Sequence, residues 1–271
     1  MPVTDQPPSE ADSEYWRRIL TGEDRGLAFY ERAFRRLPSP PRCKLCQAPF
    51  SGPLSPLFRL AGFRRWGLNQ QICKWCIGSL EKHSGGAEIP VSVLYADVRG
   101  STALAETIAP AEFSRRLNHF YKTAAVAIDA ESGVIDHMAG DGLMAMWIPG
   151  FVRGDHPKHA LLAGKRMATD LASDDALPVG IAVHTGEAYV GVVGHEGSRD
   201  FTVLGDVANT VARLSSTAAK GELAISESIA AAAGIDTSGL THHLVELKGK
   251  SEPFGAWIAD VAWKPESAGA R

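Results

Sequence analysis

The sequence predicts an α+β fold: a ferredoxin-like βαββαβ core with a C-terminal extension, preceded by a small helical and cysteine-bearing module. Two observations lead to this prediction. After Pro90, apolar runs of strand length and stretches of helical periodicity follow one another in the order β-α-β-β-α-β. Before Pro90, the chain is rich in proline and holds all four of its cysteines. At 271 residues, the chain is long enough for one large domain with an appendage.

The part before the core divides into four segments. Residues 1–12 are polar and contain several prolines, so we expect them to be disordered. Residues 13–40 carry apolar side chains spaced by three, four or seven, which predicts one or two amphipathic helices with a break near Gly22. Residues 41–84 form the cysteine module, and residues 85–90 are expected to be a linker.

The core is expected over residues 91–262, with a tail over 263–271. Its predicted elements are a buried strand in VSVLYADV, helix across 102–132, two short strands in GVIDHMAG and GLMAMWIP, a helix in DHPKHALLAGKRMATDLA, two strands in LPVGIAVHTGEAYVGVVG, a helix in LGDVANTVARLSSTA, and closing strands in HHLVELKG and GAWIADVAW. The Gly-Asp-Gly between the two short strands is typical of a hairpin turn.

Composition and charge argue against several classes of partner. The formal net charge is −3, and no basic stripe with aromatic residues stands out, so nucleic acid is not an expected partner. No apolar run approaches the roughly 20 residues that cross a bilayer, so no membrane span is expected. The acidic, proline-rich N-terminus does not resemble a signal peptide. We therefore expect a cytoplasmic protein whose cysteines are reduced unless they hold a metal.

The cysteines form two Cys-x-x-Cys pairs, a pattern typical of a four-thiolate metal site. They are Cys43, Cys46, Cys73 and Cys76, with 26 residues between the pairs. Tetrahedral zinc is the favoured occupant, and an iron–sulfur cluster would use the same ligands. A redox dithiol is the third interpretation and a disulfide the fourth. Metal binding would contribute to folding of so small a module, through which an unknown regulator could also act.

Two aspartates stand at the ends of predicted strands in the core. Asp97 and Asp141 each follow an apolar strand and precede a glycine within three residues. Carboxylates in this position suit a hard divalent cation that also holds substrate phosphates. If the two strands are neighbours, two metals could lie between the carboxylates. The alternative is that each aspartate is an ordinary turn or helix-capping residue.

Two further groups of residues fit phosphate chemistry. Gly100, Ser101 and Thr102 precede a helix, whose N-terminal amides are a natural phosphate cradle, although a plain helix cap explains them equally. Asn209 and Arg213 are four residues apart and share one helix face. Their amide and guanidinium groups can hold a ribose and a phosphoryl group together. The alternative for this pair is a solvated helix face.

Five sequence blocks occur in order: VLYADVRGSTALAE, HMAGDGLMAMW, VGIAVHTGEAYVGVVG, RDFTVLGDVANTVARLSSTA and VELKGKSEP. Together, over roughly residues 88–262, they resemble the catalytic domain of class III nucleotidyl cyclases, the adenylate and guanylate cyclase family. The resemblance implies a homodimer with active sites at the subunit interface. It also implies that a nucleoside triphosphate is converted into a cyclic nucleotide and pyrophosphate.

The resemblance also implies roles for particular residues. Asp97 and Asp141 match the two metal-binding aspartates of the family, with the Val98 carbonyl assisting, and each active site would hold two Mg²⁺ or Mn²⁺ ions. Asn209 and Arg213 match residues that stabilise the transition state from the partner chain.

The base-reading positions depart from the common pattern of the family. His137 stands where a lysine is usual, and its partner position is Thr202, as in bacterial adenylate cyclases. Lys248, by contrast, matches a triphosphate-binding lysine. ATP is the favoured substrate, with GTP less favoured and a pyrimidine triphosphate still open. His137 could instead be an ordinary hydrogen-bonded strand residue.

These observations lead to one main hypothesis and two alternatives. The main hypothesis is an adenylate cyclase that forms cyclic AMP. The first alternative is a cyclase-like dimer of weak or absent activity that binds nucleotides or partners. The second is an adaptor that depends on the cysteine module alone.

Overall fold

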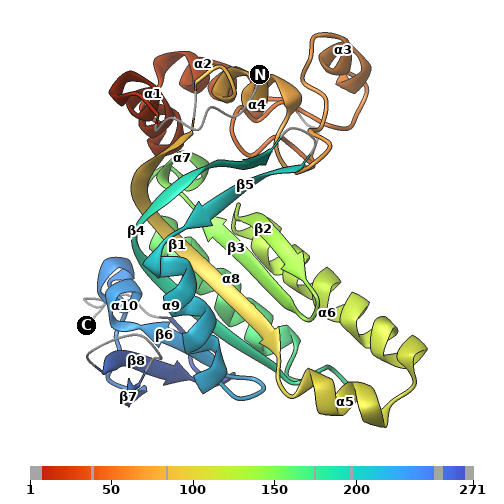
Figure 1. Cartoon of the computed structure of the whole chain (residues 1–271), viewed down its shortest axis with the longest axis vertical. Coiled ribbons are helices and arrows are strands. Elements are labelled where there is room, and N and C mark those ends of the chain that lie inside the picture. Colours follow the sequence, from red (N-terminus) through yellow and green to blue (C-terminus); the bar gives the residue numbers. More distant parts are fainter. Residues whose placement is uncertain are drawn as a thin grey trace. The chain divides into compact units, whose positions relative to one another are not determined.

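The protein is described by a computed structural model covering residues 8–37, 40–83, 85–173, 175–195, 198–246 and 253–265 (Figure 1). The chain forms two compact units. Within the described ranges, the first unit draws on residues 1–89, 148–154 and 188–204, and the second unit on residues 90–147, 155–187 and 205–271. The first unit thus combines the N-terminal segments with two later pieces of the chain.

The first unit is mainly helical. It contains α1 (Glu10–Thr21), α2 (Arg25–Arg35), α3 (Ser55–Leu60), α4 (Lys74–Leu80), α7 (Pro149–Val152) and β5 (Ser198–Leu204). α1 begins inside the segment expected to be disordered, because the Ser9 hydroxyl caps it by accepting a hydrogen bond from the Asp12 N–H. Gly22 ends α1 in the left-handed region, with φ 80°. The helical segment therefore divides into two helices at this glycine.

The second unit contains the remaining helices and strands. They are α5 (Ser101–Thr107), α6 (Pro110–Ala130), β2 (Val134–Ala139), β3 (Gly142–Trp147), α8 (His156–Asp170), α9 (Asp206–Leu214), the 3-10 turn η1 (Ser215–Thr217), β6 (Leu223–Ser226), α10 (Glu227–Ala233), β7 (Thr241–Val245) and β8 (Phe254–Ala259). Two long strands, β1 (Gly86–Val98) and β4 (Val179–His195), have residues in both units. β1 begins inside the expected linker, because Gly86 has no Cβ to overlap the Val190 carbonyl oxygen.

The sheet has the strand order β2-β3-β1-β4-β6-β8-β7, and β5 pairs with β4 (Figure 1). β1 pairs with β3, and β3 with β2, in antiparallel register, whereas β4 and β6 are parallel. α5 and α6 connect β1 to β2, and α8 lies between β3 and β4 in the chain. This order is βαββαβ followed by an extension, so the predicted α+β, ferredoxin-like core is confirmed.

One predicted division of the core was wrong. The segment LPVGIAVHTGEAYVGVVG forms the single strand β4 instead of two strands. Gly186 stays within the strand, where the missing side chain lets α9 approach: a Cβ here would lie 3.0 Å from Cγ2 of Val207. The glycine therefore serves close packing, and it does not turn the chain.

The core of the second unit is built on β1. Val91, Val93, Leu94 and Ala96 are all fully buried, which is typical of a strand covered on both faces. α6 and α8 pack against each other, and α8 also packs on β3 and β6. Within the described residues, no helix combines the length and apolar character that crossing a bilayer requires.

Candidate active site

Asp97 and Asp141 lie at the same end of two neighbouring antiparallel strands of the second unit. Asp97 is in β1, opposite Gly142, the first residue of β3. The Val98 N–H donates to the Asp141 carbonyl oxygen at 3.2 Å, which ties the hairpin turn to the end of β1. Gly140 makes the turn in the left-handed region, with φ 63°. The hairpin therefore brings the second carboxylate beside the first.

The surroundings of Asp97 disfavour its negatively charged form. Burial and the charge of Asp141 raise the pKa of Asp97 above its ordinary value, and Arg99 opposes this increase by a smaller amount. Burial also raises the pKa of Tyr95 and of Tyr121, and both carboxylates add to these increases. A cation bound at the two carboxylates would relieve the repulsion that these increases reflect.

The two tyrosines contact the residues around the carboxylates, and no motif had singled them out. The Tyr121 hydroxyl donates to the Gly140 carbonyl oxygen at 2.8 Å. A Cβ added to Gly142 would lie 2.6 Å from Tyr95 Oη and 2.9 Å from Asp97 Oδ1, so the site has no room for a side chain there. Tyr95 precedes Asp97 by two residues, so the two side chains share one face of β1. The place of Tyr95 beside Asp97 could therefore have been predicted from the sequence. Tyr121 comes from α6, and no local pattern predicts its place.

The loop after β1 leads directly into α5. Gly100 precedes the helix in the left-handed region, with φ 62°, and no side chain caps the first turn. Ser101 is half-buried and Thr102 is exposed. Arg99 holds the start of this loop, since its guanidinium donates to the Ala218 carbonyl oxygen at 2.6 Å. The three predicted phosphate-binding residues thus follow Asp97 at the end of β1.

α9 presents Asn209 and Arg213 to solvent. Its opposite face is buried and consists of Val207, Thr210, Val211 and Leu214. Both predicted transition-state residues are exposed and lie one turn apart on the same face. In the described part of the chain, neither side chain forms a hydrogen bond or an ion pair. Both groups are therefore available to another molecule.

The predicted base-reading residues lie on different strands of different units. His137 is in β2, with its side chain 47% exposed, and its Nδ1 lies 3.2 Å from Asp136 Oδ2. Thr202 is half-buried in β5, where it pairs with Gly191 of β4. Lys248 lies outside the described residues.

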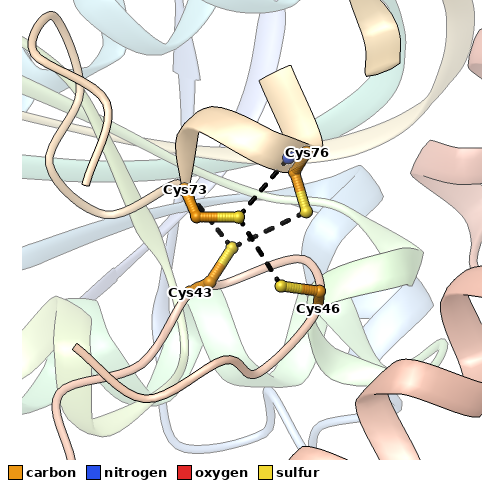
Figure 2. A group of neighbouring side chains, drawn as sticks. All are labelled: Cys43, Cys46, Cys73 and Cys76. Atoms are coloured by element: carbon orange, nitrogen blue, oxygen red, sulfur yellow. Dashed lines mark hydrogen bonds between the residues drawn. The ribbon is translucent and has the colours of Figure 1, made fainter. Parts of the chain in front are cut away.

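The four cysteines lie together in the first unit (Figure 2). Their Sγ atoms are all within 4.8 Å of one another, and all four residues are buried free thiols. The Sγ atoms of Cys43 and Cys76 are 3.9 Å apart, and those of Cys46 and Cys73 are 3.7 Å apart. Cys73 also caps α4, because its Sγ accepts a hydrogen bond from the Cys76 N–H at 3.4 Å.

Comparison with known proteins identifies the family of the second unit's domain. The family described as "Adenylate and Guanylate cyclase catalytic domain" matches residues 87–259. The chain belongs to this family. Its cyclase domain includes Asp97, Asp141, His137, Asn209 and Arg213, whereas the four cysteines lie outside the matched residues.

Individual cyclases support this assignment. An adenylate cyclase of Anabaena cylindrica is 33% identical over 135 residues, which are 46% of this chain and 26% of that protein. The guanylyl cyclase Cya2 has 28% identity and a TM-score of 0.58, with 64% of this chain and 93% of that chain covered. The adenylyl cyclase CyaB from P. aeruginosa has the same fold, with 22% identity, a TM-score of 0.57, and 64% and 95% of the two chains covered.

The chain spans about a quarter of the length of the curated relatives that it matches. The matched proteins share the nucleotidyl cyclase domain with this chain. Domains of this family bind a nucleoside triphosphate, use Mg²⁺ or Mn²⁺ and typically form dimers. The relatives include both adenylyl and guanylyl cyclases, so family membership leaves the base open.

Proposed function

We propose that the protein is a cytoplasmic adenylate cyclase that converts ATP into 3′,5′-cyclic AMP and pyrophosphate at the interface of a homodimer. The observation that supports this most directly is the pair of carboxylates, Asp97 and Asp141, at adjacent strand ends of a cyclase domain. The exposed Asn209 and Arg213 on α9 support it further, because they are free to reach a substrate on a partner chain.

The carboxylate site fits divalent cations. Burial and then the charge of Asp141 raise the pKa of Asp97, so the pair favours a positive ion. Carboxylate and carbonyl oxygens are the ligands that Mg²⁺ and Mn²⁺ prefer. Asp97, Asp141 and the Val98 carbonyl would hold two such ions. When bound, the ions lower the pKa of the ribose 3′-hydroxyl and neutralise charge on the triphosphate.

The protein's own groups would orient the substrate and stabilise the transition state. As the 3′-oxygen attacks the α-phosphorus, negative charge grows on the phosphoryl oxygens, and Arg213 would stabilise it with its planar fork of N–H donors. Asn209, one turn earlier on the same face, would hydrogen-bond the ribose and keep the hydroxyl in line. The amides and hydroxyls of Gly100, Ser101 and Thr102, together with Lys248, would bind the triphosphate.

The dimer proposal is tested by complementation between chains. Asp97→Ala and Arg213→Ala homodimers should each be inactive. A random mixture is half heterodimers, and each heterodimer has one intact site of two, so the mixture should recover about a quarter of the wild-type rate. The absence of recovery in verified heterodimers would refute shared sites.

ATP is the proposed substrate because Thr202 matches bacterial adenylate cyclases at its position. His137 would complete base recognition: neutral imidazole offers one donor and one acceptor to the purine edge. Its side chain is half exposed and so is accessible to a ligand. His137→Ala should then reduce discrimination between ATP and GTP by about tenfold or more, whereas the exposed α6 variant His119→Ala should not.

Product analysis with purified protein, four nucleoside triphosphates and Mg²⁺ or Mn²⁺ tests the proposed reaction. Cyclic AMP formed from ATP is the expected result. Another cyclic nucleotide as the main product would show altered base specificity. Nucleotide binding without any product would show a catalytically inactive cyclase domain.

For the four cysteines we propose one structural Zn²⁺ ion. Tetrahedral zinc with Zn–S bonds of about 2.3 Å separates its sulfurs by about 3.8 Å, and the two Sγ–Sγ distances of 3.7 and 3.9 Å agree with that value. An iron–sulfur cluster, the alternative occupant, contains several iron atoms and would separate the thiolates further.

The pKa values of the cysteine thiols also favour a cation among the four sulfurs. Hydrogen bonding to Cys43 raises the pKa of both Cys46 and Cys76, so the four buried sulfurs cannot all ionise without a positive ion among them. Metal analysis of protein purified with and without oxygen should give one zinc per chain. Iron with acid-labile sulfide would replace the zinc assignment.

A further inference from the structure

Strand β5 has one buried face and one more exposed face in the first unit. Phe201 and Val203 are 1% and 3% exposed, whereas Thr202 between them points to the opposite face. The indole of Trp16 in α1 stacks on the Phe201 ring, with centroids 6.4 Å apart and planes at 15°. The position of the proposed base-reading threonine is therefore set from behind by packing on the N-terminal helices.

A salt bridge links the same strand to the helix that carries two of the cysteines. Arg199 Nη1 lies 3.1 Å from the Oε1 of Glu81, the residue that ends α4. The two side chains are only 17% and 32% exposed, so the pair is more strongly held than a surface ion pair. Cys73 and Cys76 begin this two-turn helix, so the proposed metal centre fixes one end of α4 and Arg199 the other.

α1 joins these elements into one packed group. The Trp16 Nε1–H donates to the His83 carbonyl oxygen at 3.1 Å, just after α4. The Tyr15 ring stacks on the His83 ring at 3.8 Å, and the Tyr15 hydroxyl shares a hydrogen bond of 2.8 Å with Ser79 of α4. Since Trp16 is fully buried, a shift of α4 has to be accommodated by α1 and by β5.

We propose that the four-cysteine metal centre controls the nucleotide affinity of the cyclase domain through Arg199, a positioning residue that fixes β5 and with it Thr202. The inference rests on the proposed metal site and on the proposed role of Thr202. Without the metal, the first turn of α4 loses its anchor and Glu81 no longer holds Arg199. β5 then loses one of the contacts that hold it, beside its pairing with β4 and the packing of Phe201 on Trp16. β5 also leads through the single residue Gly205 into α9, which carries Asn209.

Hydrogen exchange tests the structural coupling independently of catalysis. The full chain is compared before and after a thiol-competing chelator removes the metal, with loss of metal verified by elemental analysis and Mg²⁺ then restored. We expect the amides of residues 198–204 to exchange at least fivefold faster after removal, while those of α6 stay unchanged. Unchanged exchange over 198–204 in metal-free protein would overturn the proposal, whether or not the chain makes a cyclic nucleotide.

Kinetics of a variant test whether Arg199 transmits the effect. Arg199→Gln should keep its metal but raise the KM for ATP about fivefold or more, with a smaller change in kcat. Metal removal should then raise KM by less than a further twofold, because the connection is already broken. Arg199→Lys, which keeps the charge, should restore most of the affinity.

The matched control is Arg115→Gln, which breaks the exposed ion pair with Glu112 on α6 and should leave KM unchanged. The coupling would be refuted if Arg199→Gln had the same KM as wild type. It would also be refuted if metal removal raised the KM of Arg199→Gln by as large a factor as it raises the wild-type KM. Faster exchange over 198–204 in a chain that forms no product would support the coupling and count only against the proposed cyclase reaction.

Discussion

A buried histidine in the second unit should make the stability of the protein depend on pH. His156, the first residue of α8, is 7% exposed and lies beside the fully buried Ser92. The Thr185 hydroxyl donates to the Val91 carbonyl oxygen, and the Ser92 hydroxyl donates to Thr185 Oγ1, each at 3.0 Å. Ser92 Oγ must then accept from His156 Nδ1–H at 2.8 Å, which places a proton on Nδ1.

The size of the effect follows from the pKa of this imidazole. Burial lowers the pKa of His156 to about 4, with Asp155 opposing the decrease, whereas an unfolded chain has a value near 6.5. The unfolded state therefore binds the proton more readily between these values. The contribution of the histidine to stability is complete above pH 6.5 and is lost as the pH falls toward 4. The full loss is about 3 kcal/mol, and about 2 kcal/mol of it is reached at pH 5.

Urea unfolding at pH 7.5 and pH 5.0 measures this loss. The wild-type chain should lose about 2 kcal/mol more unfolding free energy than His156→Gln, since glutamine cannot titrate but can still donate to Ser92. His119→Gln, which removes an exposed histidine from α6, should behave as wild type. An equal loss in His156→Gln and wild type would refute the assignment of a neutral buried imidazole.

Two further predictions concern the carboxylate site. Burial is the main cause of the raised pKa of Asp97, and Asp141→Asn removes the smaller part that comes from the charge of Asp141. The variant should therefore stabilise the metal-free chain by about 0.5 kcal/mol in urea unfolding while abolishing cyclase activity; a less stable variant would contradict this. Gly142→Ala places a Cβ 2.9 Å from Asp97 Oδ1 and 2.6 Å from Tyr95 Oη, so the carboxylate must move and kcat should fall about 100-fold with little loss of stability. The control is Gly239→Ala, where a Cβ meets no atom within 4 Å, and full activity in Gly142→Ala would show that the site can adapt.

Local patterns predicted much of the core because several of its elements have their own signal in the sequence, whereas β6 and α10 were not predicted. β1 reads as a continuous apolar run, and the hairpin of β2 and β3 is announced by its Gly-Asp-Gly turn. The meeting of Asp97 and Asp141 follows once these strands are neighbours. The two strands predicted for LPVGIAVHTGEAYVGVVG were wrong, because a glycine such as Gly186 within an apolar run can mark a turn or a close approach, and only the position of Val207 distinguishes the two.

Other features depend on contacts between distant segments and leave no local signal. Tyr121 reaches the hairpin from α6, and Arg199 meets Glu81 across 118 residues of chain. In the same way, residues 188–204 join the first unit although their sequence reads as part of the core. Tertiary packing decides these contacts, and residue type alone permits many other pairings.

The carboxylate site destabilises the metal-free protein. Asp97 and Asp141 repel each other, and the hydroxyls of Tyr95 and Tyr121, whose pKa values are raised, lie near them. Each feature lowers the stability of the folded chain in the absence of a ligand. Each is explained if a cation and a phosphate bind there, because their binding stabilises the folded state. The proposed zinc site follows the same logic in the first unit, where it would place a positive ion among four buried sulfurs. If both proposed cation sites are occupied, the one that anchors α4 could act on the cyclase reaction through Arg199 and β5.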